Sequence, residues 1–125
     1  MPDYVPALVS SLKYQQKAAR VGFDWAEAAP ILDKVAEEAQ ELREAMNNQD
    51  QAHIEEEYGD LLFAMVNLGR HLNLEPEMAL RAANNKFKRR FHHIEDALNS
   101  NDSSLEAATL DEMEALWNKA KQAGK

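Results

Sequence analysis

The sequence predicts an all-α protein, folded as an antiparallel bundle of four to five helices. In five segments, apolar residues recur every three or four positions, which is the spacing of one helix face. No convincing alternation of apolar and polar residues predicts a β-strand, and all four prolines lie at or before the start of a helical segment. The 125 residues suffice for one domain with a hydrophobic core and are too few for two. We therefore expect a single domain over residues 1–125.

Each predicted helix begins or ends at a recognisable signal. Gly22 breaks the first pattern, and Pro30 begins the second because proline is favoured in a first helical turn. Asp50 is a predicted N-cap for the third helix, and Thr109 with Glu112 forms a capping-box sequence before the fifth. The predicted helices cover about residues 6–20, 30–47, 51–72, 76–99 and 109–124.

The third predicted helix is apolar over about half of its circumference. Leu62, Phe63 and Val66 lie beside its main apolar seam and widen it. A helix with so wide an apolar surface needs burial on two sides, so we expect a homodimer with this helix at its centre. The apolar seam of the third helix consists of Ile54, Tyr58, Leu61, Met65, Leu68 and Leu72, and that of the second of Ile31, Val35, Ala39, Leu42 and Met46.

The composition excludes several classes of protein. The formal net charge of −8 argues against a general nucleic-acid binder, because such proteins carry basic surfaces. The sequence has no cysteine, so disulfides and thiolate metal sites are excluded, and a cytoplasmic location is expected. No signal-peptide pattern and no apolar run of membrane-spanning length occurs, so we expect no membrane association.

Two acidic pairs lie within the second and third predicted helices. Glu38 and Glu41 are three residues apart, as are Glu57 and Asp60, and residues at this spacing share a helix face. Glu38 and Glu57 lie beside the apolar seams on a helical wheel, so packing the two helices together would direct all four carboxylates to one place. Converging carboxylates need a cation, and hard oxygen ligands suit Mg²⁺ or Mn²⁺. The pattern therefore predicts a metal centre between the helices.

Two other interpretations compete with this metal centre. A single acidic pair is more often a solvated surface feature, but two pairs that flank the core on consecutive helices favour a functional site. A di-iron bundle needs Glu-x-x-His on two helices. No glutamate here has a histidine three residues later, which ranks the di-iron site low.

Basic residues beside the core form a further feature. Lys86 and Arg90 are one turn apart and flank the apolar face of the fourth predicted helix, where they could hold a polyphosphate beside a metal. Surface charges whose stems lie over the core are an equally good interpretation of these two residues. Trp117 and Lys121 repeat the arrangement in the fifth helix, although a lone tryptophan is more often a core residue.

These motifs occur together in a known family. Glu-Glu-x-x-Glu at residues 37–41 and Glu-x-x-Asp at residues 57–60 resemble the signature of the MazG-type nucleoside triphosphate pyrophosphohydrolases. The likeness extends from Ala18 to Lys121 and is greatest to the C-terminal, catalytic domain of the two-domain members. Those members carry two such modules, whereas this chain holds one. The other segments that carry the likeness are Ala18–Trp25, Glu57–Ala64, Val66–His71 and Lys86–Phe91.

The resemblance implies an all-α dimer that hydrolyses a nucleoside triphosphate between the α and β phosphates, giving a nucleoside monophosphate and pyrophosphate. It implies Mg²⁺, for which Mn²⁺ can substitute, as the cofactor. Carried over by position, the metal ligands are Glu38, Glu41, Glu57 and Asp60. The expected substrate contacts are Lys86 and Arg90 for phosphates and Trp117 and Lys121 for the nucleotide, with Lys34 and Trp25 as weaker candidates for a phosphate and the base.

The general base and the alternative function complete these expectations. Glu37 is the candidate that takes a proton from the attacking water, although a solvated position on its helix is an equally good interpretation. A non-catalytic interaction module that kept the fold is the alternative function. The presence of all four carboxylates together with Lys86 and Arg90 favours the enzyme.

Overall fold

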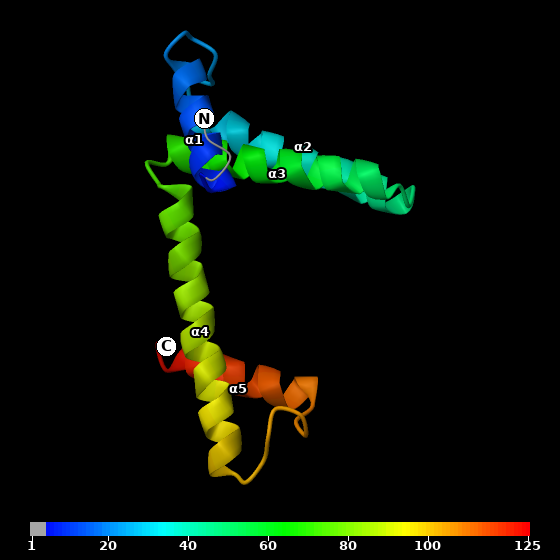
Figure 1. The fold of residues 1–125 in the computed structure, drawn as a ribbon, viewed down its shortest axis with the longest axis vertical. Helices are drawn as coiled ribbons and strands as arrows, with labels where there is room; N and C mark the ends of the chain where they lie inside the picture. The colour runs from blue at the N-terminus through cyan, green and yellow to red at the C-terminus, as the bar shows by residue number, and fades with distance from the viewer. Residues whose placement is uncertain (1–4) are drawn as a thin grey trace. The chain divides into compact units, whose positions relative to one another are not determined.

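The computed structural model describes residues 5–125, and these residues form five helices and no strand (Figure 1). The predicted all-α class is confirmed. Each predicted helix is present, with boundaries within two residues of the predicted ones. Within residues 5–125, no helix has both the length and the apolar character needed to cross a membrane. The helices are α1 (Ala7–Ala19), α2 (Ala28–Asn47), α3 (Gln51–His71), α4 (Pro76–Ser100) and α5 (Leu110–Gln122).

Two side-chain caps begin helices as predicted. The Asp50 carboxylate accepts a hydrogen bond from the backbone N–H of His53 at 3.3 Å, at the start of α3. The Thr109 hydroxyl accepts from the N–H of Glu112 at 3.1 Å, at the start of α5. Each bond satisfies one of the backbone donors that the first helical turn leaves without a partner.

Pro30 and Gly22 lie near the helix ends that they predict, but Pro30 is not the first residue of α2. The helix begins at Ala28, so Pro30 is its third residue rather than its first. Proline still fits there, because the backbone N–H of a first-turn residue has no partner within the helix. Gly22 has φ of +89°, a left-handed conformation that suits glycine at the end of the α1 segment.

The chain divides into two compact units, residues 1–79 and 80–125, and each is described by itself. In the first unit, α2 and α3 pack side by side as an antiparallel hairpin, and α1 packs against α3 (Figure 1). The second unit contains α5 and most of α4. The single domain and the single bundle therefore stay predictions.

A seven-residue spacing defines the buried face of the hairpin. In α2 the buried residues are Ile31, Glu38 and Ala45, which lie two helical turns apart along one face. In α3, Glu57 and Ala64 are buried at the same spacing. One carboxylate in each helix therefore occupies a core position of the α2–α3 seam.

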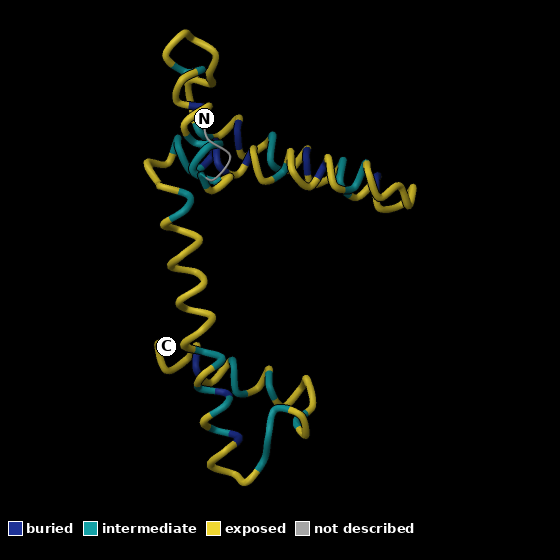
Figure 2. Tube along the Cα trace, in the orientation of Figure 1, coloured by how far each residue is buried: buried dark blue, intermediate teal, exposed yellow. Residues whose placement is uncertain are grey.

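The apolar seams predicted for α2 and α3 are consequently wrong in part. Met46 is 59% exposed, Tyr58 is 55% exposed and Met65 is 47% exposed. Figure 2 shows buried, intermediate and exposed positions alternating along the α2–α3 hairpin. The physical reason is that the buried faces run through Glu38 and Glu57, so they are rotated from the purely apolar stripes that the pattern favours. These apolar side chains are exposed in the single chain, and the homodimer stays a prediction.

The second unit has a small core of its own. Ile94 and Leu98 of α4 and Ala120 of α5 are its buried apolar residues. Beside them, the ring of Phe87 lies 5.5 Å from that of Trp117, centroid to centroid. Phe87 is nevertheless 57% exposed, although it lies on the apolar face of the fourth helix that Lys86 and Arg90 flank.

Candidate metal centre

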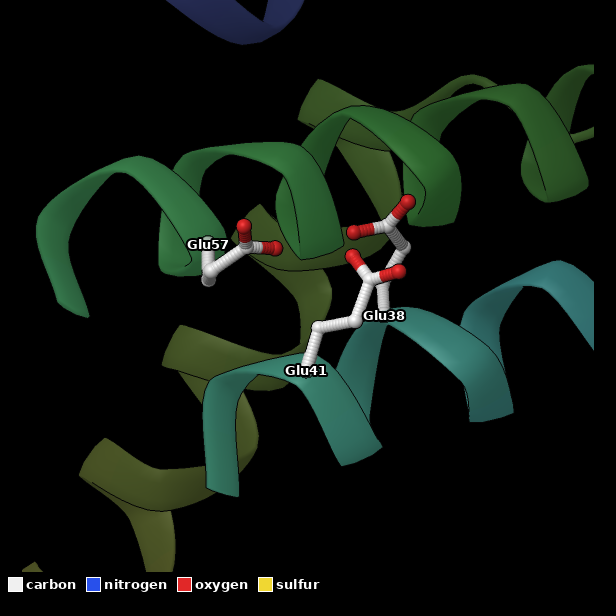
Figure 3. A group of neighbouring side chains, drawn as sticks. All are labelled: Glu38, Glu41 and Glu57. Atoms are coloured by element: carbon white, nitrogen blue, oxygen red, sulfur yellow. The ribbon is translucent and has the colours of Figure 1, made fainter. Parts of the chain in front are cut away.

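The α2–α3 hairpin brings three glutamates together (Figure 3). Glu38 and Glu41 come from α2 and Glu57 from α3, and one carboxylate oxygen of each lies within 4.8 Å of the others. Glu38 and Glu57 occupy the buried faces of two antiparallel helices, which directs both into the seam. Glu41 follows Glu38 by one turn on the same side of α2. The predicted convergence of carboxylates from these two helices is thus observed for three residues.

Two of the three glutamates are almost completely buried. Glu38 is 6% exposed and Glu57 is 8% exposed. The Oε2 atom of each is shielded from solvent and meets no hydrogen-bond donor within residues 5–125. A buried carboxylate oxygen without a partner is unfavourable unless a cation or a donor meets it. This set of oxygen atoms therefore fits a hard divalent cation.

The other oxygen of each buried glutamate has a partner. The Lys34 Nζ lies 2.9 Å from Glu38 Oε1, and it also lies 3.8 Å from Glu37 Oε1. The His53 Nε2 lies 3.2 Å from Glu57 Oε1. Each buried carboxylate is thus held through Oε1 by a residue one turn earlier in its own helix, while its Oε2 is buried and unpaired within residues 5–125.

The crowding of carboxylates changes their protonation. Interaction with Glu57, then with Glu38, together with burial, raises the pKa of Glu41 to about 7. The hydrogen bond from Lys34 lowers the pKa of Glu38, against the opposing effect of burial. At neutral pH, a proton on Glu41 therefore offsets part of the repulsion that a bound cation would remove.

Asp60, the fourth predicted ligand, lies in an adjoining acidic group. Oxygens of Glu56, Glu57 and Asp60 lie within 4.8 Å of one another. Glu57 thus belongs to both acidic groups. A hollow of about 290 Å³ is lined by both Glu38 and Asp60, so Asp60 borders the same space as one member of the three-glutamate group.

The hollow also brings in two predicted substrate contacts. Lys34 and Trp25 line it together with Glu38 and Asp60. Glu37, by contrast, has a side chain that is 59% exposed and is not among the residues that line this hollow. Its role as general base stays a prediction.

A second hollow of about 260 Å³ was not foreseen from the sequence. It shares Trp25, Phe63 and Asn67 with the first hollow, and it is also lined by Tyr14 and Gln15 of α1. The sequence did indicate Asn67 as a candidate site residue, because it continues the row of Glu57 and Asp60 along α3 at helical spacing. No sequence pattern indicated that Tyr14 and Gln15 of α1 would line this hollow.

The other predicted substrate contacts lie in the second unit. The guanidinium carbon of Arg90 lies 5.3 Å from the ring centroid of Trp117, a cation–π arrangement, and its Nε donates to the backbone oxygen of Lys125 at 2.9 Å. Lys86 and Lys121 are exposed. The structure thus pairs Arg90 with Trp117, and the contact of these four residues with a nucleotide stays a prediction.

Comparison with known proteins identifies the same family that the sequence motifs resemble. Residues 27–95, more than half of the chain, match the model of the MazG nucleotide pyrophosphohydrolase domain. Nucleoside triphosphate pyrophosphohydrolase of Escherichia coli K12 is 44% identical over 98% of this chain and 47% of its own length. Nucleoside triphosphate pyrophosphohydrolase/pyrophosphatase MazG of Thermotoga maritima is 43% identical over 94% of this chain and 45% of its own length.

The chain therefore spans about half the length of these relatives. An uncharacterised protein of Bacillus subtilis, YabN, is 43% identical over 56% of this chain and 14% of its own length. The matched segment 27–95 contains all of the three-glutamate group and Asp60. The domain match, together with the helical fold and the carboxylates it brings together, shows that this chain belongs to the MazG nucleotide pyrophosphohydrolase domain family.

Proposed function

We propose that this chain hydrolyses nucleoside triphosphates between the α and β phosphates, in the presence of Mg²⁺, to a nucleoside monophosphate and pyrophosphate. The observation that carries the proposal is the group of Glu38, Glu41 and Glu57, in which two buried oxygens lack a donor. The names of two curated relatives, both nucleoside triphosphate pyrophosphohydrolases, support the same reaction.

The metal in this proposal is held by oxygen atoms alone. A carboxylate set favours Mg²⁺, and Mn²⁺ can substitute because it accepts similar ligands. When bound, the cation would supply positive charge that offsets the negative charge of the phosphates during phosphoryl transfer. The proposed ligands are Glu38, Glu41, Glu57 and Asp60.

Basic side chains hold the triphosphate in this scheme. Lys34 borders the hollow beside the carboxylates, so its ammonium group is available to a phosphate oxygen that approaches Glu38. Lys86 and Arg90 are the further proposed phosphate contacts, and the planar guanidinium of Arg90 suits two phosphate oxygens at once.

Aromatic side chains receive the nucleoside. Trp25 is 46% exposed and borders both hollows, which leaves its ring accessible to a base. Phe63, which is 49% exposed, lines the same two hollows and offers a second apolar surface. Trp117 and Lys121 are the proposed nucleotide contacts from α5.

The chemical step breaks one bond and forms another. The oxygen of a water molecule attacks the α-phosphorus, and the bond between that phosphorus and the oxygen bridging to the β-phosphorus breaks. The bridging oxygen leaves with the electron pair as part of pyrophosphate. Glu37 is the proposed acceptor of the water proton, and its carboxylate lies 3.8 Å from the Lys34 ammonium.

We also propose that the chain acts as a cytoplasmic homodimer. The supporting observation is the set of half-exposed apolar side chains on one face of α3, Tyr58, Leu62 and Met65. Large apolar side chains left exposed together along one helix face are typical of a subunit interface. Sedimentation equilibrium would test this, because a monomer at micromolar concentration would contradict it.

Product analysis tests the proposed reaction directly. The protein would be incubated with separate ribo- and deoxyribonucleoside triphosphates in Mg²⁺, and the products separated by ion-exchange chromatography. Monophosphate and pyrophosphate in equal amounts are expected. Diphosphate and phosphate would indicate a different phosphatase chemistry.

Two variants control this assay. Glu57→Gln should abolish turnover because it removes a buried metal ligand. Glu55→Gln makes the same change of charge two residues away, at an exposed position of α3, and should leave turnover intact. Absence of turnover by the unaltered chain in both Mg²⁺ and Mn²⁺ would favour a non-catalytic interaction module instead.

A further inference from the structure

The loop between α1 and α2 brings Trp25 to both hollows. Trp25 lines the hollow of about 260 Å³ beside α1 and the hollow of about 290 Å³ that Glu38 and Asp60 border. The tryptophan lies outside the helices and is 46% exposed. Packing against the core therefore covers only part of its surface, so the place of its ring depends on how the backbone of the loop is anchored.

Backbone hydrogen bonds anchor the start of this loop to α1. The N–H groups of residues 21–23 donate to the carbonyl oxygens of Ala18 and Ala19 at 3.0–3.1 Å. The opposite wall of the hollow beside α1 is different, because Phe63, Asn67 and Arg70 of α3 form it. The bonds of residues 21–23 do not reach that wall.

One carboxylate oxygen joins the loop to α3. Asp24 Oδ1 accepts from Arg70 Nη2, lies 2.8 Å from His71 Nε2 and also accepts from the backbone N–H of Trp25 at 2.8 Å. Arg70 holds the pKa of Asp24 well below its usual range, so the carboxylate is ionised at neutral pH. An ionised carboxylate only accepts, so His71 Nε2 is the donor in this contact. The same oxygen thus binds two side chains in the last turn of α3 and the backbone of Trp25.

The guanidinium of Arg70 is itself oriented by α3. Its Nε and Nη2 donate to Asn67 Oδ1 at 3.3 Å and 2.8 Å. The side chains of Arg70 and Asp24 are 15% and 21% exposed, so their contact is largely shielded from solvent. Charge-assisted hydrogen bonds are stronger than neutral ones, and shielding strengthens them further. Because Asp24 precedes Trp25 directly, this contact sets where the tryptophan lies relative to α3.

The position of Trp25 matters for the nucleoside. Trp25 lines both hollows from the loop, and Phe63 lines both from α3, so a base between them needs these two rings at a fixed separation. We propose that Asp24, bound by Arg70 and His71, positions the ring of Trp25 for contact with the nucleoside base. This inference rests on the proposed function, which gives Trp25 its role as a base contact. Asp24 and Arg70 are positioning residues that act through Trp25.

A double-mutant cycle tests whether Arg70 acts through Trp25. Arg70→Met removes the donors, and Trp25→Leu removes the ring. Stacking on an aromatic ring changes the affinity for a base by about fivefold or more, so each variant should raise the KM for GTP by up to about that factor, with kcat changed less than about twofold. The double variant should have the KM of Trp25→Leu alone, because Arg70 then has no ring to position. A further rise in KM, or a fall in kcat, in the double variant would show a purely structural role and overturn the proposal.

Two more variants separate position from charge. Arg70→Lys keeps a donor for Asp24 and should restore part of the KM that Arg70→Met loses. Arg20→Met is the matched control, because it removes the same charge at an exposed position beside the same loop, and it should leave the KM unchanged. An equal rise in KM from Arg20→Met and Arg70→Met would assign the effect to lost positive charge and contradict the positioning role.

Fluorine NMR of the protein labelled with fluorotryptophan gives a readout that needs no turnover. The chain has two tryptophans, so Trp25→Leu assigns both signals, and Trp117 in the second unit is an internal reference for folding. Arg70→Met should shift or broaden the Trp25 signal of the free protein and leave the Trp117 signal in place. Asp24→Asn should act in the same direction with a smaller effect, because an amide oxygen still accepts from the Trp25 N–H.

Titration with GMP in the same experiment separates failure of this inference from failure of the proposed function. GMP should move the Trp25 signal of the unaltered protein, and should move it less in Arg70→Met. That result would support the inference even if the chain hydrolysed no triphosphate. A Trp25 signal that ignores GMP, or that is the same in the unaltered protein and in Arg70→Met, would overturn the inference, and turnover of GTP would then leave the proposed reaction intact.

Discussion

Replacing Glu57 by glutamine should stabilise the metal-free protein and destroy its response to Mg²⁺. Glu57 is 8% exposed, and its Oε2 meets no donor within residues 5–125. Its other oxygen lies 3.2 Å from His53 Nε2, a contact that a glutamine oxygen can keep as a hydrogen bond. The substitution thus removes a buried charge from the three-glutamate group and preserves the shape of the side chain.

The magnitude follows from the burial of that oxygen. Leaving a buried acceptor without a partner costs about 1–3 kcal/mol. The NH₂ group that replaces Oε2 can donate to the neighbouring carboxylates of Glu38 and Glu41, so the substitution should add about that much to the free energy of unfolding. For a domain of this size, 1 kcal/mol corresponds to roughly 3–4 °C in Tm, which predicts a rise of about 3–12 °C in the presence of EDTA. Mg²⁺ at about one thousand times its Kd should stabilise the unaltered protein by about 4.1 kcal/mol and the variant far less.

Thermal unfolding followed by circular dichroism, in EDTA and in saturating Mg²⁺, is the assay. The order of the two melting temperatures should invert between the two conditions. Glu55→Gln, with the same charge change at an exposed position of α3, should shift Tm by less than about 2 °C in either buffer. If the two variants behave alike, or if Mg²⁺ leaves the melting of the unaltered protein unchanged, the argument that these carboxylates form a cation site is refuted.

Three further predictions concern protonation and charge around the site. Glu57 is the chief cause that raises the pKa of Glu41 from 4.5 to about 7 in the folded protein, so the metal-free protein should lose stability as pH rises through that range. In thermal melts between pH 5 and 8, Glu41→Gln should make Tm depend less on pH. Lys34→Met should lower kcat/KM about tenfold by removing a phosphate contact, and an unchanged value in steady-state kinetics would exclude Lys34 from substrate binding. The hydrogen bond from Arg70 holds the pKa of Asp24 well below its usual range, so the Asp24–Arg70 contact stabilises the fold above about pH 4 and progressively less below it. Asp24→Asn should therefore lower Tm by about 3–4 °C at pH 7. The free energies of unfolding by denaturant at pH 7 and pH 3 should differ less in the variant than in the unaltered protein.

Local signals in the sequence account for the helices and for the carboxylates. Asp50 and Thr109 begin helices because a side-chain oxygen and a backbone N–H three residues later are close in sequence, so no distant contact is needed. The spacing of Glu38 and Glu41 likewise fixes their common helix face. Adding a short turn between two helices was then enough to bring Glu57 to the same seam.

The details of burial could not be read from the pattern. An apolar stripe predicted Met46 and Tyr58 in the core, whereas the buried faces of the hairpin include Glu38 and Glu57. Periodicity assigns a charged residue to the surface by default, and only the packing of two helices reveals that a carboxylate occupies a core position.

The hollow beside α1 depends on contacts between residues that are distant in the sequence. The bond between Gln15 Nε2 and the backbone oxygen of Phe63 joins residues 48 positions apart, and that between Arg70 and Asp24 joins residues 46 apart. No local rule relates such pairs. Asn67 was visible as a polar residue in the row of Glu57 and Asp60, but the direction of its amide depends on Arg70 and therefore on the folded structure.

The position of the glutamates in the α2–α3 seam links occupancy of the site to local unfolding of the hairpin. Glu38 lies between Ile31 and Ala45 on one buried face, so separating α2 from α3 exposes the proposed metal ligands and the core in a single event. Without a cation, the repelling carboxylates favour this opening, and protein–solvent amide exchange and proteolytic cleavage in α2 and α3 become faster. Substituting Glu38 by leucine would make this part of the seam an apolar core, and the resulting hairpin should be more stable but unable to bind the cation. The glutamates proposed to bind the cation thus lower the stability of the metal-free hairpin below that of the same hairpin with an apolar seam.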